Sequence, residues 1–163
     1  MSEKPGAVPE PGPYLETTAE GEALFLVLRA HRLLFDAIDR ELRNGGALSL
    51  ALWEVLVVLS LSAEGRMRMS DVRRGMLVSK SNVTKLVDRL EEAGAVIRES
   101  AASDRRGCYA RLTPFGGEVV RRGGEIFNRV ARQQLAKTLD HDEIAKIVAG
   151  LTKVILDNQK REG

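Results

Sequence analysis

The chain has 163 residues, of which 44% are hydrophobic and 29% charged, and this balance is typical of one soluble globular domain. No stretch reaches the roughly 18 uninterrupted apolar residues of a membrane span, and the N-terminus lacks the features of a secretory signal, so the expected location is the cytoplasm. The single cysteine, Cys108, excludes an internal disulfide framework. With only His31 and His141 beside it, no metal or cofactor is expected.

The charge is unevenly distributed along the chain. Between Arg66 and Arg122 there are 13 Lys or Arg and 7 Asp or Glu, a balance of +6, whereas the other residues sum to −4. Clustered cations release the counterions that condense on phosphates, so the central basic block favours a polyanion as partner. A solvated charged surface is the alternative interpretation.

The N-terminal part predicts a tail and one long helix. Residues 1–15 contain four of the five prolines and are expected to be disordered, whereas 16–163 form the folded domain. Thr17 and Glu20 have the spacing of a capping box at a helix start. Apolar residues then recur every three or four positions in a wide stripe, which predicts a helix that buries two faces and ends at Asn44.

Three helices are predicted in the next segment. Ser49 is expected to cap the first of them, and residues 70–77 have the length of a two-turn helix. Ser79 is expected to cap the third, which runs to Ala93 and is closed by Gly94. The apolar residues of this third helix share one face, which leaves polar and basic side chains to face outward, namely Lys80, Ser81, Asn82, Thr84, Lys85 and Arg89.

The C-terminal part predicts a hairpin and two helices. Residues 96–100 and 108–112 are strand-like and are joined by a charged tip, 101–107. Pro114 predicts a helix start at its first position, and this helix should reach about Thr138. Its two glycine pairs cost about 1 kcal/mol per residue relative to alanine, so we expect it to bend or fray early. A capping box at 140–143 opens the last amphipathic helix.

Two short helices joined by a tight turn and followed by a basic hairpin form a winged helix-turn-helix. A helix fits the major groove of B-DNA, where short polar side chains and lysine reach base edges or phosphates. A slim hairpin can place Arg105 or Arg106 in the minor groove, where the negative potential attracts guanidinium. The sequence contains no catalytic set, phosphate loop or metal-ligand spacing, so no enzyme is predicted. The predicted DNA contacts are Ser79, Lys80, Ser81, Asn82, Thr84, Lys85, Arg89, Arg105 and Arg106.

The sequence resembles the MarR family of bacterial transcription regulators from about Leu24 to Gln159. The residues that carry the resemblance are Leu48-Ser49 before Trp53, Ser70-Asp71-Val72, the run 78–94, and Asp104-Arg105-Arg106 followed by Leu112-Thr113. The resemblance implies a mainly α homodimer in which residues 16–47 and 114–160 form the dimerisation lobe. It implies that the winged helix-turn-helix lobe, 48–113, binds a pseudo-palindromic operator. It also implies that Asp104 orients the tip of the wing while Arg106 enters the minor groove.

The resemblance further implies a repressor that a small, aromatic or phenolic effector releases. Its pocket would lie where the dimerisation helices meet the DNA-binding lobe. For His31, a place in the core or at an interface is the alternative to a ligand contact. The candidate residues for lining the pocket are Phe25, Arg29, His31 and Trp53.

Cys108, Asp88 and the charge of the wing each bear on an alternative interpretation of the sequence. Some members of the family sense peroxide with a cysteine near the start of the first helix, but Cys108 lies on a wing strand and has no second cysteine to resolve a sulfenic acid. Phosphate repels a carboxylate, so Asp88 is expected to pair with a nearby arginine and not to touch DNA.

A winged-helix protein-interaction module without sequence-specific DNA binding is the alternative function. The charge of the wing and of the helix 79–93 opposes it, because the cores of protein interfaces are depleted in charge.

Overall fold

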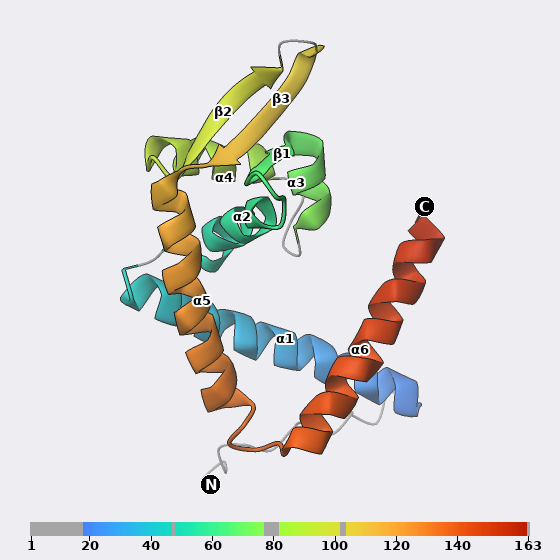
Figure 1. The fold of residues 1–163 in the computed structure, drawn as a ribbon. Coiled ribbons are helices and arrows are strands. Elements are labelled where there is room, and N and C mark those ends of the chain that lie inside the picture. Colours follow the sequence, from blue (N-terminus) through green and yellow to red (C-terminus); the bar gives the residue numbers. More distant parts are fainter. Residues whose placement is uncertain (1–17, 47, 77–81, 102–103, 163) are drawn as a thin grey trace, which may run out of the picture. The chain divides into compact units, whose positions relative to one another are not determined.

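The computed structural model describes residues 18–46, 48–76, 82–101 and 104–162, with the backbone alone at 101, 104–107 and 162. The chain divides into two compact units, residues 1–35 and 36–163. The elements of the structure, in chain order, are α1 (Ala19–Asn44), α2 (Leu50–Ser60), β1 (Arg66–Arg68), α3 (Met69–Gly75), α4 (Val83–Glu92), β2 (Val96–Ala101), β3 (Asp104–Leu112), α5 (Pro114–Gln134) and α6 (His141–Glu162) (Figure 1).

The described part of the first unit is the N-terminal portion of α1. The hydroxyl of Thr18 accepts a hydrogen bond from the N–H of Gly21 at 3.2 Å, so Thr18 caps the helix. The predicted cap, Thr17, lies outside the described residues. The large apolar side chains of this stretch are 40–65% exposed, and they are Leu24, Phe25, Leu26, Val27, Leu28 and Leu33.

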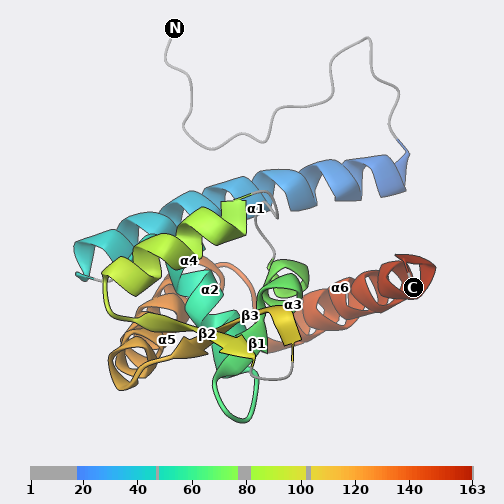
Figure 2. The ribbon, with the colours of Figure 1, turned by 90° about the horizontal axis from the view of Figure 1, so that it is seen from above.

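The second unit contains the C-terminal part of α1, from Asp36, then the predicted winged helix-turn-helix, and then the helices α5 and α6. Its sheet is antiparallel with the strand order β1-β3-β2. The strand β1 was not predicted, and β2 and β3 reach residues 101 and 104, so the expected tip at 101–107 is mostly strand. The hairpin of β2 and β3 projects beyond the helices in Figure 1, and α2 packs against α4 and α5 (Figure 2).

The strand register gives the sheet two different faces. Successive side chains of a strand point to opposite faces, and Val96 pairs with Leu112 and Arg98 with Ala110. Val96 and Ala110 are fully buried, so this face lies against the helices. Arg98 therefore stands on the inner face, at the edge strand β2.

One apolar core joins the sheet to α2, α3 and α4. Full burial of a leucine or valine is worth about 1.5–3 kcal/mol. A second cluster joins the C-terminal part of α1 to α2 and α5 around Trp53. The fully buried residues of the first core are Val55, Leu56, Leu59, Val72, Val87, Leu90, Ala95, Val96 and Ala110.

The helix α5 begins as predicted but differs in its interior. The hydroxyl of Thr113 accepts a hydrogen bond from the N–H of Gly116 at 3.0 Å, with Pro114 at the first position. The helix is continuous through both glycine pairs, so it does not fray at them. It ends at Gln134, four residues before the predicted end at about Thr138. Gly123 lies under Trp53, and a Cβ there would be 2.0 Å from the indole Nε1. Gly123 therefore allows α5 to pack closely against Trp53 of α2.

The helix α6 begins with the predicted capping box. The Asp140 carboxylate accepts from the N–H of Glu143 at 2.8 Å, and the Glu143 carboxylate accepts from the N–H of Asp140 at 2.8 Å. The two side chains thus satisfy backbone donors that the first turn leaves without helical partners.

The predicted cap of α2 is wrong. Ser49 occupies the N-cap position, but its side chain makes no capping hydrogen bond. Instead, the N–H of Leu50 donates to the Asp39 carboxylate of α1 at 2.7 Å, and the Arg43 guanidinium donates to its other oxygen at 2.7 Å. Desolvation raises the pKa of Asp39, but these hydrogen bonds outweigh it and hold the pKa below its ordinary value.

We expect Asp39→Asn to lower the free energy of unfolding by about 1 kcal/mol at neutral pH. A carboxyl whose folded pKa is depressed stabilises the fold above its unfolded pKa of about 3.9 and loses this contribution as the pH falls through the folded pKa. The deficit of the variant should therefore shrink below about pH 4. Urea unfolding of both proteins across this range measures it. Ser49→Ala is the control and should change stability by less than about 0.5 kcal/mol.

Candidate nucleic-acid interface

The helix α4 presents the outward face that the sequence predicts. Val83, Val87 and Leu90 are buried in the core, whereas Thr84 and Lys85 are exposed. Arg89 and the N-cap residue Asn82 are exposed as well. The described helix begins at Val83, and the predicted contacts Ser79, Lys80 and Ser81 lie outside the described residues.

The basic side chains of α4, Lys85 and Arg89, are available to bind an anion. Lys85 and Arg89 are four residues apart, so they are neighbours on the helix surface. Within the described ranges, neither side chain forms an ion pair or a hydrogen bond. Unpaired ammonium and guanidinium groups on an exposed helix face are suited to bind phosphate.

Two of the three acidic residues of α4 pair with an arginine of the wing strand β2. The Arg98 guanidinium forms an ion pair with Asp88, as predicted for that aspartate. It also lies 3.5 Å from the Glu91 carboxylate and donates to the carbonyl oxygen of Thr84 at 3.2 Å. The backbone N–H of Arg98 donates to Glu91 at 3.0 Å. The sequence did not show which arginine would be the partner of Asp88.

For the predicted contact residues of the wing, the structure describes only the backbone. Asp104, Arg105 and Arg106 form the first residues of β3, and their side chains are outside the described part of the structure. The roles given to them at the tip stay predictions. Cys108 is exposed on the same strand, opposite Ser100.

The outer face of the sheet carries a cluster that the sequence analysis missed. The Glu99 carboxylate pairs with the Nε of Arg66 at 2.8 Å and with the Nε of Arg111 at 2.7 Å. These hydrogen bonds, with that from Arg66 the strongest, lower the pKa of Glu99. The Arg66 guanidinium lies 3.8 Å from the ring centroid of Tyr109, and Arg68 donates to the Tyr109 hydroxyl at 2.7 Å. The alternation of Arg66 and Arg68 is the sequence signal for this strand, but three residues are too few to predict it.

The helix α3 extends the basic surface. Met69, Ser70, Arg73 and Arg74 line an open depression. Arg74 pairs with Asp71, and its hydrogen bond lowers the pKa of that carboxyl. Arg73 is exposed and forms no ion pair with any described residue. Neither α3 nor the outer face of the sheet was among the predicted contacts.

The predicted pocket residues fall into the two units. Trp53 is buried in the second unit, where its indole N–H donates to the carbonyl of Val120 at 3.3 Å and its ring lies 5.7 Å from that of Phe127. In the first unit, the Arg29 guanidinium lies 5.9 Å from the ring of Phe25, and His31 lies 5.9 Å from the ring of Phe35. The effector pocket stays a prediction.

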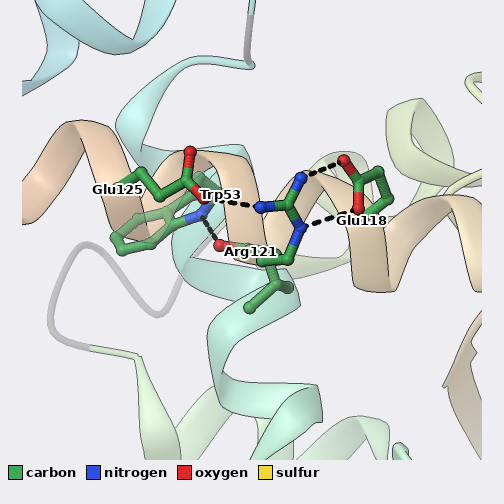
Figure 3. Close-up of polar contacts among 5 residues, drawn as sticks. Trp53, Glu118, Arg121 and Glu125 are labelled. Atoms are coloured by element: carbon green, nitrogen blue, oxygen red, sulfur yellow. Dashed lines mark hydrogen bonds and ion pairs between the residues drawn. The ribbon is translucent and has the colours of Figure 1, made fainter.

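Charged side chains cover the surface of α5 beside Trp53. Arg121 lies between Glu118 and Glu125, at 2.7 and 2.5 Å, on the exposed side of the helix (Figure 3). The Arg121 hydrogen bond lowers the pKa of Glu118. Exposed pairs of this kind contribute about 0–1 kcal/mol, so the packing of Trp53 does more to fix α5 than this surface row does.

The described residues offer no site for a metal ion and no membrane-spanning helix. They contain no group of three or more His, Cys, Asp or Glu that could hold a metal ion. Among the helices of the described ranges, none combines the length and the hydropathy that crossing a membrane requires.

Comparison with known proteins identifies the family. A family model described as the MarR family matches residues 48–107. The uncharacterized HTH-type transcriptional regulator YfiV of Bacillus subtilis is 30% identical over 117 residues, which cover 71% of this chain and 72% of that protein.

Two solved structures from Streptomyces coelicolor are similar to the chain as a whole. Sco3205, a MarR family transcriptional regulator crystallised in complex with DNA, matches with a TM-score of 0.75 and 29% identity over 88% of this chain and 91% of its own. AbsC, another MarR family regulator, matches with a TM-score of 0.75 and 29% identity over 90% of this chain and 99% of its own. The chain therefore belongs to the MarR family of transcriptional regulators.

Proposed function

We propose that this regulator is a homodimeric repressor that binds a pseudo-palindromic operator and is released by a small molecule. The observation that carries the DNA-binding part is the exposed face of α4, on which Lys85 and Arg89 are unpaired while Asp88 is covered by Arg98. The similarity to Sco3205, whose structure contains DNA, supports the same conclusion.

In this proposal α4 is the recognition helix and lies in the major groove. Asn82, Thr84, Lys85 and Arg89 contact base edges and phosphates, together with Ser79, Lys80 and Ser81 before the helix. The wing carries Arg105 and Arg106 into the adjacent minor groove. Two half-sites about one helical turn apart accept only a narrow range of separations between the two recognition helices.

The release step rests on the family resemblance. A small aromatic or phenolic effector bound to the dimer would favour a separation of the recognition helices that the operator does not accept. It must bind that state of the dimer more tightly than the DNA-bound state, because a ligand shifts an equilibrium only by its differential affinity.

A protein-interaction module is the alternative function, and the described surface opposes it. The cores of protein interfaces are depleted in charge, whereas Lys85 and Arg89 of α4 are exposed and its apolar residues Val83, Val87 and Leu90 are buried.

The decisive test removes both free cations of α4. Lys85→Ala with Arg89→Ala should flatten the dependence of log affinity on log salt by about two, because each phosphate contact releases close to one counterion. The probe is a duplex that the wild-type protein selects from a random-sequence library, and binding is followed by fluorescence anisotropy. Lys153→Ala with Lys160→Ala, which removes the same charge from α6, is the control and should leave the slope unchanged. An equal slope for the wild type and the α4 variant would refute the proposed interface.

A further inference from the structure

The recognition helix α4 contains more acidic than basic residues. Within Val83–Glu92 there are two basic residues, Lys85 and Arg89, and three acidic ones, Asp88, Glu91 and Glu92. The helix on its own therefore carries a net negative charge. A helix of this charge would be repelled by the phosphates that flank a major groove.

The structure places a counter-ion beside two of these three carboxylates. Thr84, Asp88 and Glu91 are spaced by four and three residues, so they form one stripe along the helix. Lys85 and Arg89 form the neighbouring stripe. Arg98 reaches the first stripe from β2, with its guanidinium on the carbonyl oxygen of Thr84 at 3.2 Å, on Glu91 at 3.5 Å and in an ion pair with Asp88.

The fold fixes the position of Arg98 beside α4. Its backbone is fixed by the register of β2 with β3, opposite the buried Ala110. Its backbone N–H also donates to Glu91 at 3.0 Å, so the arginine is tied to α4 at both ends. Its side chain is 28% exposed, less than that of Arg111 on the other face of the sheet, which is 46% exposed.

We infer that Arg98 is a positioning residue for DNA binding, which neutralises Asp88 and Glu91 so that the exposed face of α4 is basic through Lys85 and Arg89. This inference rests on the proposed DNA-binding function. Uncovered carboxylates about one helical turn from the phosphate-binding side chains would lie well within the screening length of about 10 Å at 0.1 M salt. The arginine acts on the nucleic acid through the helix and needs no contact with it.

Neutralising the two carboxylates should matter little while Arg98 covers them and should matter strongly once it is gone. The test therefore compares Asp88→Asn with Glu91→Gln in two backgrounds, Arg98→Gln and Arg111→Gln. Both backgrounds lose one positive charge from the same sheet, but Arg111 pairs with Glu99 and not with α4.

Affinity is measured by anisotropy at low salt on the duplex selected by the wild-type protein. Arg98→Gln should weaken binding roughly five- to tenfold, and Arg111→Gln less than about threefold. Adding the two carboxylate substitutions should recover roughly tenfold in the Arg98→Gln background and less than about threefold in the Arg111→Gln background. Recovery by the same factor in both backgrounds would overturn the inference, because the effect would then be one of net charge alone.

Two controls separate the possible failures. Circular dichroism reports whether Arg98→Gln folds; if it does not, Asp88→Asn with Glu91→Gln in the wild-type background decides, because covered carboxylates predict an affinity within about threefold of the wild type. A gain of more than tenfold there would show that the carboxylates are uncovered and would refute the inference. If the wild-type protein binds no duplex, the proposed function itself fails. If it binds but the coupling is absent, the role of Arg98 alone fails.

Discussion

Gly123→Ala is expected to lower the free energy of unfolding by about 2–3 kcal/mol, the cost of forcing an extra methyl group into a packed core. The new Cβ would lie 2.0 Å from Nε1 and 2.4 Å from Cδ1 of Trp53. No rotation of the small methyl group relieves this overlap, so the indole must move. Its movement would break the hydrogen bond to Val120 and disturb the buried cluster that Trp53 forms with Ile126.

The adjacent residue supplies a matched control. A Cβ at Gly124 meets nothing within 4 Å, so Gly124→Ala should stabilise the protein by up to about 1 kcal/mol through helix propensity alone. Urea unfolding followed by far-ultraviolet circular dichroism measures both variants, and the fluorescence of Trp53, the single tryptophan of the chain, reports the local change. Equal effects of the two substitutions would show that the indole does not press on α5.

A second pair of glycines repeats this contrast at the start of the helix. A Cβ at Gly116 would lie 2.1 Å from the carbonyl oxygen of Ala95, whereas one at Gly117 meets nothing within 4 Å. Gly116 and Gly123 are seven residues apart and therefore share a face of α5. That spacing was visible in the sequence, but helix propensity treats all four glycines alike, and only the neighbours of each explain its role.

The elements that the sequence predicted well are those whose signals are local. The capping box of Asp140 and Glu143 depends on residues three apart, the start of α5 depends on Pro114, and the outward face of α4 depends on helical periodicity. Such signals are complete in a short window of sequence, so the structure confirms them.

The predictions that failed depend on residues far apart in the chain. The N–H of Leu50 finds the carboxylate of Asp39, eleven residues before it, although Ser49 is the better local candidate. The strand β1 exists because Arg66–Arg68 pairs with β3, more than forty residues later.

The same limit applies to the candidate site. Phosphate repulsion was enough to assign Asp88 a structural partner, but the face on which Arg98 stands is set by the register of β2. A shift of one residue in that register would turn Arg98 to solvent and Ile97 to α4. Sequence reasoning therefore predicted the exposed face of α4 and a structural partner for Asp88, and missed which arginine that partner is.

Leu151→Lys with Ile155→Lys is expected to convert a dimer into a monomer that binds the selected duplex at least about 100-fold more weakly, because the two half-sites would be bound independently. Large apolar side chains of α6 are 41–59% exposed in the described chain, and they are Ile147, Val148, Leu151, Val154, Ile155 and Leu156. Soluble monomers rarely expose apolar patches beyond a few hundred Å². We therefore propose that a second copy of the chain covers this stripe, as the family resemblance also implies.

Sedimentation equilibrium of the full chain at micromolar concentration measures the association directly, and Lys153→Gln on the same helix is the control for a change in α6 that leaves the apolar stripe intact. Removal of residues 140–163 should be more damaging than the two lysine substitutions, because it deletes the stripe and leaves any surface that the stripe covers open to water. That variant should aggregate or unfold. A truncated protein that sediments as a folded monomer would refute the role of α6 in the dimer, whereas a wild-type monomer that still binds the duplex tightly would require each copy to recognise its half-site alone.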